Sequence, residues 1–203
     1  MGKNIGLIPL GFTEIWSASF NSAIIISAGD NAEFIAFCGI NLDITIFNKE
    51  NVYLPAFLKT YPFLNVEVEN KDKKVNSLIA IDNNPKYVAK DKKIFILDKE
   101  KNLSKQTASK VELIKELNSQ RAVCRRIIAE LKKLDLLIKK DLRVKIEGKE
   151  EKVILEEFYV INMEKLLKLD DKIIAGFARK GWMGIFDAHL KSISNFEKIL
   201  KAN

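Results

Sequence analysis

The chain has 203 residues, of which 47% are hydrophobic and 30% are charged, and its formal net charge is +7. This balance is that of an ordinary globular protein, so it excludes wholesale disorder, a collagen-like repeat and low-complexity sequence. Two cysteines and one histidine are too few for a structural zinc site, which takes about four such ligands, or for a disulfide framework. The sequence also lacks glycine-rich phosphate loops and the G-x-S-x-G turn of serine hydrolases. We therefore expect no metal and no cofactor.

The apolar runs of the chain are short. None approaches the ~20 residues that a helix needs to cross a bilayer, and the N-terminus lacks the apolar core of a secretory signal. The sequence therefore predicts a soluble cytoplasmic protein with no membrane span.

The positive charge is distributed unevenly. The net charge is −4 over residues 1–70, +4 over 71–103, +6 over 104–140 and +1 over 141–203. Three of the five arginines fall together in the most basic segment, at Arg121, Arg125 and Arg126. This segment could bind phosphates or an acidic partner, or its charges could form an ordinary solvated surface. We do not expect nucleic-acid binding, because the aromatic interleaving typical of such sites is absent.

The first half of the chain, residues 20–100, is rich in strand-forming residues. Runs of β-branched and apolar residues at 23–27 and 34–39 flank the turn sequence Ala-Gly-Asp-Asn, which predicts a hairpin. Further strands are predicted at residues 44–47, 51–54, 66–68, 78–81 and 94–97.

Residues 53–63 interrupt the strand pattern. This segment contains four aromatic residues and two prolines, Pro55 and Pro62. Proline fixes φ and disfavours helix in the residue before it. We therefore expect a short helical turn bounded by the prolines, with its aromatic side chains packed on the sheet.

Residues 104–134 carry apolar residues at helical spacing, with Ser104 and Thr107 as candidate N-caps. Arg121 stands where this apolar stripe requires another apolar residue. Two explanations are open: the helix breaks near residues 118–119, or Arg121 reaches a partner from a half-buried position.

Residues 142–160 are predicted to form a second hairpin, and residues 163–201 to be helical. Asn162 and Asp170 are candidate caps, and Gly181 separates the last helix from the one before it. The apolar face of that last helix forms one continuous seam of Trp182, Phe186, His189, Ile193, Phe196 and Leu200.

These elements together predict a single α+β domain over residues 1–203. In this domain a twisted, mainly antiparallel sheet packs against the C-terminal helices. An exposed strand edge or the seam of the last helix would allow a homo-oligomer.

His189 is the only histidine, and Ser192 lies one turn beyond it. As a functional residue His189 would be a general base, and an enzyme would then bring Ser192, Tyr53 or Tyr61 next to it. As a structural residue it would use its ring nitrogens to bond backbone or hydroxyl groups in the core. No oriented nucleophile adjoins His189 in the sequence, so we assign no catalytic residue and favour a non-enzymatic protein.

Several segments resemble the bacterial SapC-like family. The sequence YLPAFLKTYPF at residues 53–63 is similar to that family's Y-[VL]-P-A-x-[LI]-[RK]-x-Y-P-F segment. Residues 158–166 are similar to its I-D-E entry into a helix, with Asn162 in place of the aspartate. Residues 181–192 are similar to its closing helix, which ends in A-H-L-x-S.

The resemblance covers most of residues 20–200 in family order, with Asp135 in place of the usual glycine before the last strand pair. It implies a link to bacterial surface-array (S-layer) proteins, and it carries over no catalytic residue. Our leading hypothesis is a non-enzymatic cytoplasmic accessory protein for surface-layer protein production or export, which binds a protein partner or a small ligand. The alternatives are a small-molecule enzyme centred on His189 and an anion or nucleic-acid binder that uses residues 104–140. The candidate binding residues are Tyr53, Pro55, Phe57, Tyr61, Pro62 and Phe63 in the aromatic segment and Arg121, Arg125 and Arg126 in the basic segment.

Overall fold

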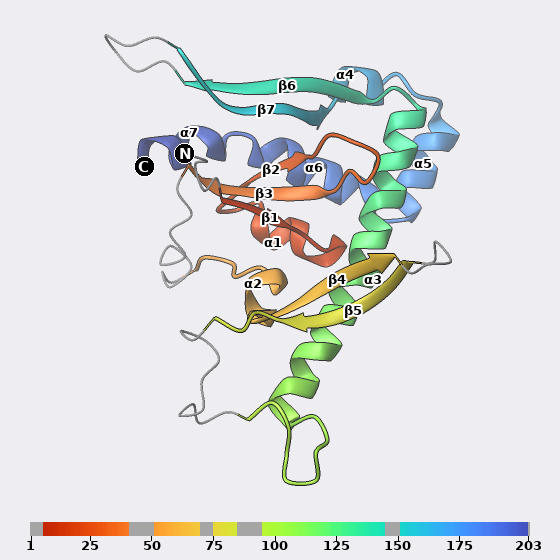
Figure 1. Cartoon of the computed structure of the whole chain (residues 1–203). Coiled ribbons are helices and arrows are strands. Elements are labelled where there is room, and N and C mark those ends of the chain that lie inside the picture. The colour runs from red at the N-terminus through yellow and green to blue at the C-terminus, as the bar shows by residue number, and fades with distance from the viewer. Residues whose placement is uncertain (1–5, 41–50, 70–74, 85–94, 145–150, 203) are drawn as a thin grey trace. The chain divides into compact units, whose positions relative to one another are not determined.

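The computed structural model describes residues 6–40, 51–69, 75–84, 95–144 and 151–202. These residues form an α+β fold, as predicted (Figure 1). The chain divides into two compact units, one comprising Met1–Pro55 with Gln120–Asn203 and the other Ala56–Ser119. That the chain acts as one domain over residues 1–203 stays a prediction.

The first unit contains a five-stranded antiparallel sheet with the strand order β1-β3-β2-β7-β6. Its strands are β1 (Gly6–Pro9), β2 (Ala23–Ile26), β3 (Phe34–Gly39), β6 (Leu137–Val144) and β7 (Lys152–Ile161). Both predicted hairpins are confirmed, as β2–β3 and β6–β7, although β6 begins earlier than expected, at Leu137. The two hairpins join between β2 and β7 at one residue pair, Ile26 opposite Tyr159. Few backbone hydrogen bonds between β2 and β7 therefore hold the two hairpins together.

The core of this unit gathers around β2, which is buried along its whole length. Burial on both faces explains why its sequence, AIII, shows no alternation of apolar and polar residues. On one face, Ala23 and Ile25 cluster with Phe37, Phe158 and Phe196. The ring centroid of Phe196 lies 5.1 Å from that of Phe37 and 5.8 Å from that of Phe158.

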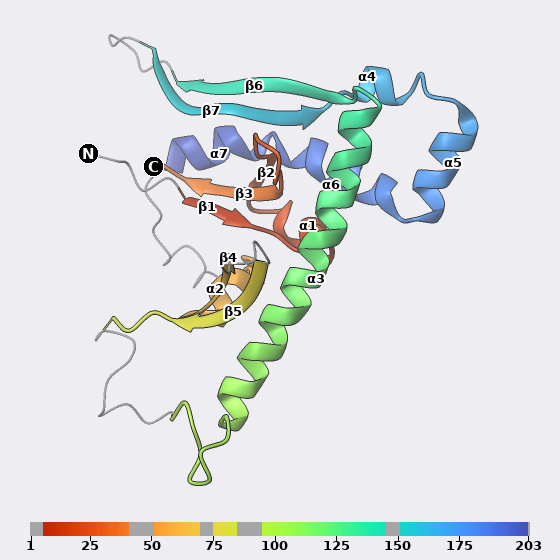
Figure 2. The same ribbon diagram turned by 45° about the vertical axis from the view of Figure 1, so that its right-hand side comes forward.

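The helices of the first unit are short. They are η1 (Phe12–Glu14), α1 (Ile15–Ala18), α4 (Met163–Leu166), α5 (Asp171–Arg179), α6 (Trp182–Ser192) and α7 (Asn195–Ala202). The predicted caps are confirmed, because the side chains of Asn162 and Asp170 accept the backbone N–H groups of Lys165 and Lys172. Helices α6 and α7 run along β2 and β3 in both ribbon views (Figures 1 and 2).

The prediction of one continuous last helix was wrong, because α6 ends at Ser192 and α7 begins at Asn195. The break has a tertiary cause. The buried Asn195 side chain donates from Nδ2 to the carbonyl oxygens of Ser19 and Ser22, at 2.7 and 3.1 Å. These bonds tie the start of α7 to the loop between α1 and β2, a constraint that helical periodicity alone does not reveal.

Helix α3 (Lys105–Lys133) is continuous and belongs to the second unit up to Ser119 and to the first unit from Gln120 onwards (Figure 2). Ser104 is its N-cap, since its Oγ accepts the Thr107 N–H at 3.3 Å. The helix does not break near residues 118–119.

The turn at the C-terminal end of α3 explains why glycine suits the position that Asp135 occupies in this chain. Asp135 has a φ of +53°, the left-handed conformation that favours glycine. The Leu136 N–H donates to the Leu131 carbonyl and the Asp135 N–H to the Lys132 carbonyl, which is the bonding pattern of a Schellman motif. Leu131 and Leu136 are both fully buried, so the turn directs the chain from α3 into β6.

The second unit contains α2 (Ala56–Thr60), the first part of α3, and a two-stranded sheet of β4 (Phe63–Glu69) and β5 (Val75–Ile81). The predicted helical turn is confirmed as α2, and the strands at 66–68 and 78–81 as parts of β4 and β5. These two strands pair only with each other among the described residues, rather than extending the main sheet.

Two strand predictions were wrong within the described residues. Residues 51–54 form no strand, because Asn51 is in the left-handed region and Pro55 follows with no backbone N–H to donate. Residues 95–97 show only an isolated bridge, because the Asp98 side chain accepts the N–H groups of Glu100 and Asn102 and closes a tight loop there. The strand predicted at 44–47 lies outside the described residues.

No helix in the described part of the chain is long and apolar enough to cross a membrane.

Candidate functional site

The A-H-L-x-S motif occupies the buried side of α6. The Oγ atom of Ser192 accepts the Ile24 N–H at 2.9 Å and donates to the His189 carbonyl at 2.6 Å. The Nε2 atom of His189 accepts the Ile161 N–H at 3.2 Å. Ile24 lies in β2 and Ile161 in β7, so the two side chains supply hydrogen bonds where these strands pair at a single position.

His189 is fully enclosed. Its ring meets that of Phe34 edge-on at a centroid distance of 6.0 Å, and Nδ1 makes no hydrogen bond among the described residues. Burial lowers the pKa of His189 to about 4, although the Ile24 backbone raises it by a smaller amount. The ring is therefore neutral near pH 7. The structure gives His189 the geometry of a core histidine and no access to a substrate.

The hydroxyl groups named with His189 in the enzyme hypothesis bond elsewhere. Tyr53 donates to Glu14 Oε1 at 2.9 Å, and Tyr61 donates to the Asp82 carboxylate and lowers the pKa of that group.

Arg121 reaches a buried carboxylate, which is the second of the two explanations for its position. Its Nη2 and Nε atoms donate to Oε2 and Oε1 of Glu33 at 2.7 and 3.1 Å. Arg125 Nη1 donates to Glu33 Oε1 at 2.7 Å. Glu33 lies just before β3. Its ion pairs with the two arginines therefore fasten α3 to the β2–β3 turn.

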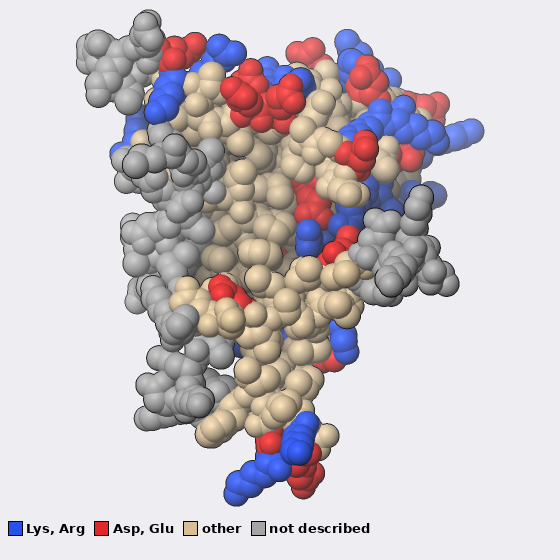
Figure 3. Space-filling model, in the orientation of Figure 1, with Lys and Arg blue, Asp and Glu red and all other residues tan. Residues whose placement is uncertain are grey.

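Two of the three clustered arginines are therefore engaged inside the protein. Arg121 and Arg125 share the single carboxylate of Glu33, which offsets one of their two charges, and Arg126 is exposed. On the face shown in Figure 3, basic and acidic side chains are interspersed. This arrangement does not favour the alternative that the basic segment binds nucleic acid.

A second buried carboxylate, Glu14, organises the turn after β1. Its Oε2 accepts the Gly11 N–H at 2.8 Å, and its Oε1 accepts the Tyr53 hydroxyl. A Cβ atom at position 11 would clash with the Gln120 side chain, so a larger residue there would displace that side chain. Burial and the neighbouring Glu14 raise the pKa of Tyr53. The main role of the Tyr53 hydroxyl is therefore to donate a hydrogen bond to Glu14 within the fold.

We expect Tyr53→Phe to lower the free energy of unfolding by about 1–2 kcal/mol, because Glu14 loses a hydrogen bond and keeps its buried charge. Urea unfolding of the purified protein measures the effect. Tyr159→Phe is the matched control, since the Tyr159 hydroxyl bonds to no described residue. Equal stability of the two variants would show that the Glu14–Tyr53 contact contributes nothing.

The rest of residues 53–63 is half-buried or buried. Pro55 and Phe63 are buried, while Phe57, Tyr61 and Pro62 are intermediate. The Lys110 ammonium donates to the carbonyl oxygens of Lys59 and Tyr61 at 2.7 and 2.8 Å, and burial lowers the pKa of Lys110. The binding role of this segment stays a prediction, and the polar contacts described for it lie within the protein.

Both cysteines are buried thiols rather than nucleophiles. Burial raises the pKa of Cys38 to about 11 and that of Cys124 to about 12, and in the second case Glu33 and Glu14 raise it further. Both are therefore protonated near pH 7.

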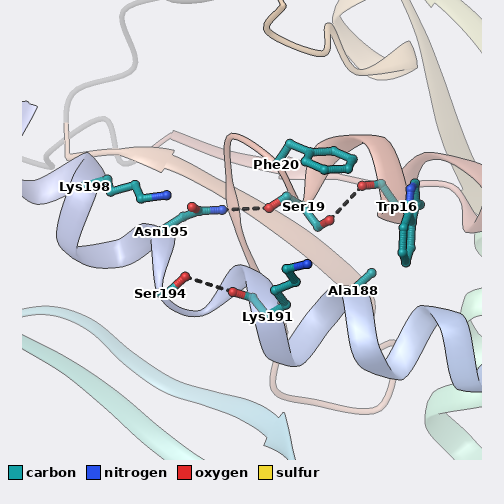
Figure 4. A pocket seen from close by; sticks show the side chains of 8 residues that line it. All are labelled: Trp16, Ser19, Phe20, Ala188, Lys191, Ser194, Asn195 and Lys198. Atoms are coloured by element: carbon teal, nitrogen blue, oxygen red, sulfur yellow. Dashed lines mark hydrogen bonds between the residues drawn. The ribbon is translucent and has the colours of Figure 1, made fainter.

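The first unit also has a pocket bordered by two exposed aromatic residues, which the sequence did not reveal. Trp16 and Phe20 are 49% and 62% exposed, and their rings meet edge-on at 6.2 Å. They border a pocket of about 140 Å³, here called the Trp16 pocket (Figure 4). Its lining residues are Trp16, Ser19, Phe20, Ala188, Lys191, Ser194, Asn195 and Lys198.

A sequence signal for this pocket did exist. Trp16 and Phe20 are four residues apart, which places them on one face of a helical turn. Ala188 and Lys191 belong to the A-H-L-x-S motif, whose His189 and Ser192 are buried. What the sequence could not show is that the two segments lie together.

The model of the SapC family matches residues 1–199. This chain belongs to the SapC family. No curated protein and no solved structure matches it significantly. Because the match spans both compact units, the closing A-H-L-x-S helix and the aromatic segment both lie within the region that defines a SapC member.

Proposed function

We propose that this SapC-family protein is a non-enzymatic, cytoplasmic accessory protein for the production or export of surface-layer proteins. It acts by binding a protein partner at the Trp16 pocket. The observation that carries the proposal is the exposed Trp16–Phe20 pair beside a concave surface. Aromatic side chains next to a pocket are the residues that most often dominate protein binding energy.

The Trp16 pocket supports this function better than residues 53–63 do. Its two aromatic residues are 49% and 62% exposed, whereas those of the segment are half-buried or buried. Its base is also held in place before any partner arrives, because Asn195 bonds the carbonyl oxygens of Ser19 and Ser22. A preformed surface loses less conformational entropy on binding.

Neither alternative function has comparable support. An enzyme centred on His189 would need an accessible ring, and His189 is fully buried. An anion binder at the basic segment would need free guanidinium groups, and two of its three arginines pair with Glu33.

Gene replacement in the bacterium that encodes the protein tests the proposal. Deleting the gene should reduce the surface-layer protein on the cell, and the wild-type gene should restore it. The Trp16→Ala/Phe20→Ala double variant should not restore it, because it removes the aromatic surface without disturbing a buried contact. Phe95→Ala, which removes an equally exposed ring outside the pocket, is the control. Full restoration by the double variant, or an unchanged surface layer after deletion, would refute the proposal.

A further inference from the structure

The Trp16 pocket is cationic. Of the eight residues that line it, two are lysines and none is acidic. Lys191 and Lys198 are both exposed and form no ion pair with a described acidic residue. In contrast, the nearby Lys201 is paired with Glu197. Figure 4 shows the ammonium groups of Lys191 and Lys198 both directed toward the pocket, from its two sides.

The serine and asparagine side chains of the pocket already donate within the protein. Ser19 Oγ donates to the Trp16 carbonyl at 2.7 Å, and Ser194 Oγ donates to the Lys191 carbonyl at 3.0 Å. Asn195 Nδ2 donates to the two carbonyl oxygens named above. The donors that remain for a ligand are the two ammonium groups and the indole N–H of Trp16, and the two positive charges favour a ligand with anionic acceptors.

The size of the pocket limits the apolar part of that ligand. A cavity of about 140 Å³ is close to the ~150 Å³ that accommodates a benzene ring. It is smaller than the ~300–1,000 Å³ of sites that enclose a whole drug-sized ligand. One aromatic or branched side chain fits beside Trp16 and Phe20, whereas a long acyl chain does not.

We propose that the Trp16 pocket binds an acidic peptide segment in which one apolar side chain is flanked on both sides by carboxylates. The apolar side chain packs against Trp16 and Phe20, and the carboxylates pair with Lys191 and Lys198. This inference rests on the proposed function and adds the chemistry of the partner. It assigns recognition to two lysines that frame the pocket rather than to the arginines of α3.

Fluorescence anisotropy with a labelled heptapeptide tests the inference. The peptide carries one phenylalanine between two pairs of aspartates, and its comparison peptides carry asparagine for aspartate or alanine for phenylalanine. The wild-type protein should bind the first peptide at least about tenfold more tightly than either comparison peptide. Binding should weaken severalfold when the salt concentration rises to ~0.5 M, because exposed ion pairs are screened.

Variants locate the binding site. Lys191→Gln/Lys198→Gln should weaken binding about tenfold, and Trp16→Ala should weaken it by a similar factor. The matched controls Lys201→Gln and Phe95→Ala should change it less than about twofold. Equal binding of the aspartate and asparagine peptides, no effect of the lysine variant, or competition by phosphatidylglycerol vesicles would each overturn the inference.

The two proposals fail in different ways. Suppose that the acidic peptide does not bind and Trp16→Ala/Phe20→Ala still fails to restore the surface layer. The binding role then stands, and the inferred partner chemistry is wrong. If the peptide binds as expected and the same variant restores the surface layer fully, the pocket is an acidic-peptide site and the surface-layer role is wrong.

Discussion

The free energy of unfolding should fall by about 3 kcal/mol between pH 7 and pH 4 because of His189 alone. Complete burial lowers the pKa of this histidine from its ordinary value of 6.5 to about 4. Between these two pH values the unfolded chain binds a proton that the folded protein does not. Stability is therefore fully present above pH 6.5, falls as the pH drops through that window, and loses nothing further from this group below pH 4.

The measurement is a series of urea unfolding curves across this pH range for wild type and His189→Gln. Glutamine has an oxygen that can accept the Ile161 N–H and does not titrate, so its curve should be flatter by about 3 kcal/mol between pH 7 and pH 4. Ser192→Ala is the matched control. It removes a buried hydrogen bond from the same helix and should lower stability by about 1–3 kcal/mol at every pH. Parallel pH profiles of wild type and His189→Gln would contradict the prediction.

Removing the charge of Glu33 should be the second large effect. Glu33→Gln should lower the free energy of unfolding by about 2 kcal/mol, because Arg121 and Arg125 would then face each other without their carboxylate. The loss stays below that of a fully buried ion pair because the side chains of Arg121 and Arg125 are 23% and 38% exposed.

A second substitution separates this cause from a general effect of position 33. Arg121 interrupts the apolar stripe of α3, so Glu33→Gln/Arg121→Leu should recover about 1 kcal/mol relative to Glu33→Gln. Arg126→Ala is the control, because Arg126 is exposed and should contribute less than about 0.5 kcal/mol. Urea unfolding at constant pH measures all three variants. Equal losses for Glu33→Gln and Arg126→Ala would show that the ion pairs of Glu33 with the two arginines have no role in stability.

These predictions give the closing A-H-L-x-S helix of this SapC member a physical role. The histidine and serine of A-H-L-x-S accept backbone N–H groups from β7 and β2. These strands meet at only one residue pair, so the motif joins the two hairpins of the sheet. The alanine and the variable position of the motif, Ala188 and Lys191, face the Trp16 pocket instead. One helix thus serves the core on one side and the proposed binding surface on the other.

Local patterns predicted the elements whose cause is local. Asn162, Asp170 and Ser104 cap helices because their side chains bond N–H groups two or three residues away. The β2–β3 hairpin follows from two apolar runs around a turn sequence. Residues 51–54 and 95–97 have apolar side chains typical of strands, but Pro55 and the loop centred on Asp98 prevent strand formation there.

The candidate site was harder to predict, because its parts come from distant segments. The seam of the last helix correctly placed Phe186 and His189 inside, yet it could not show the break at residues 193–194. That break depends on Asn195 and two carbonyl oxygens more than 170 residues away. The same contact joins two residues that line the Trp16 pocket, so the sequence could not show that the two segments of the pocket lie together.

The sequence by itself determined the SapC family, the α+β class, the caps and hairpins, and the anomaly of an arginine in an apolar stripe. Only the tertiary structure decided what that anomaly means, because Glu33 lies 88 residues before Arg121. It also decided that His189 is neutral and enclosed and that Trp16 and Phe20 meet Lys191 and Lys198. Capping and pairing depend on neighbours in the chain, whereas burial and electrostatic partnership depend on which distant segments pack together.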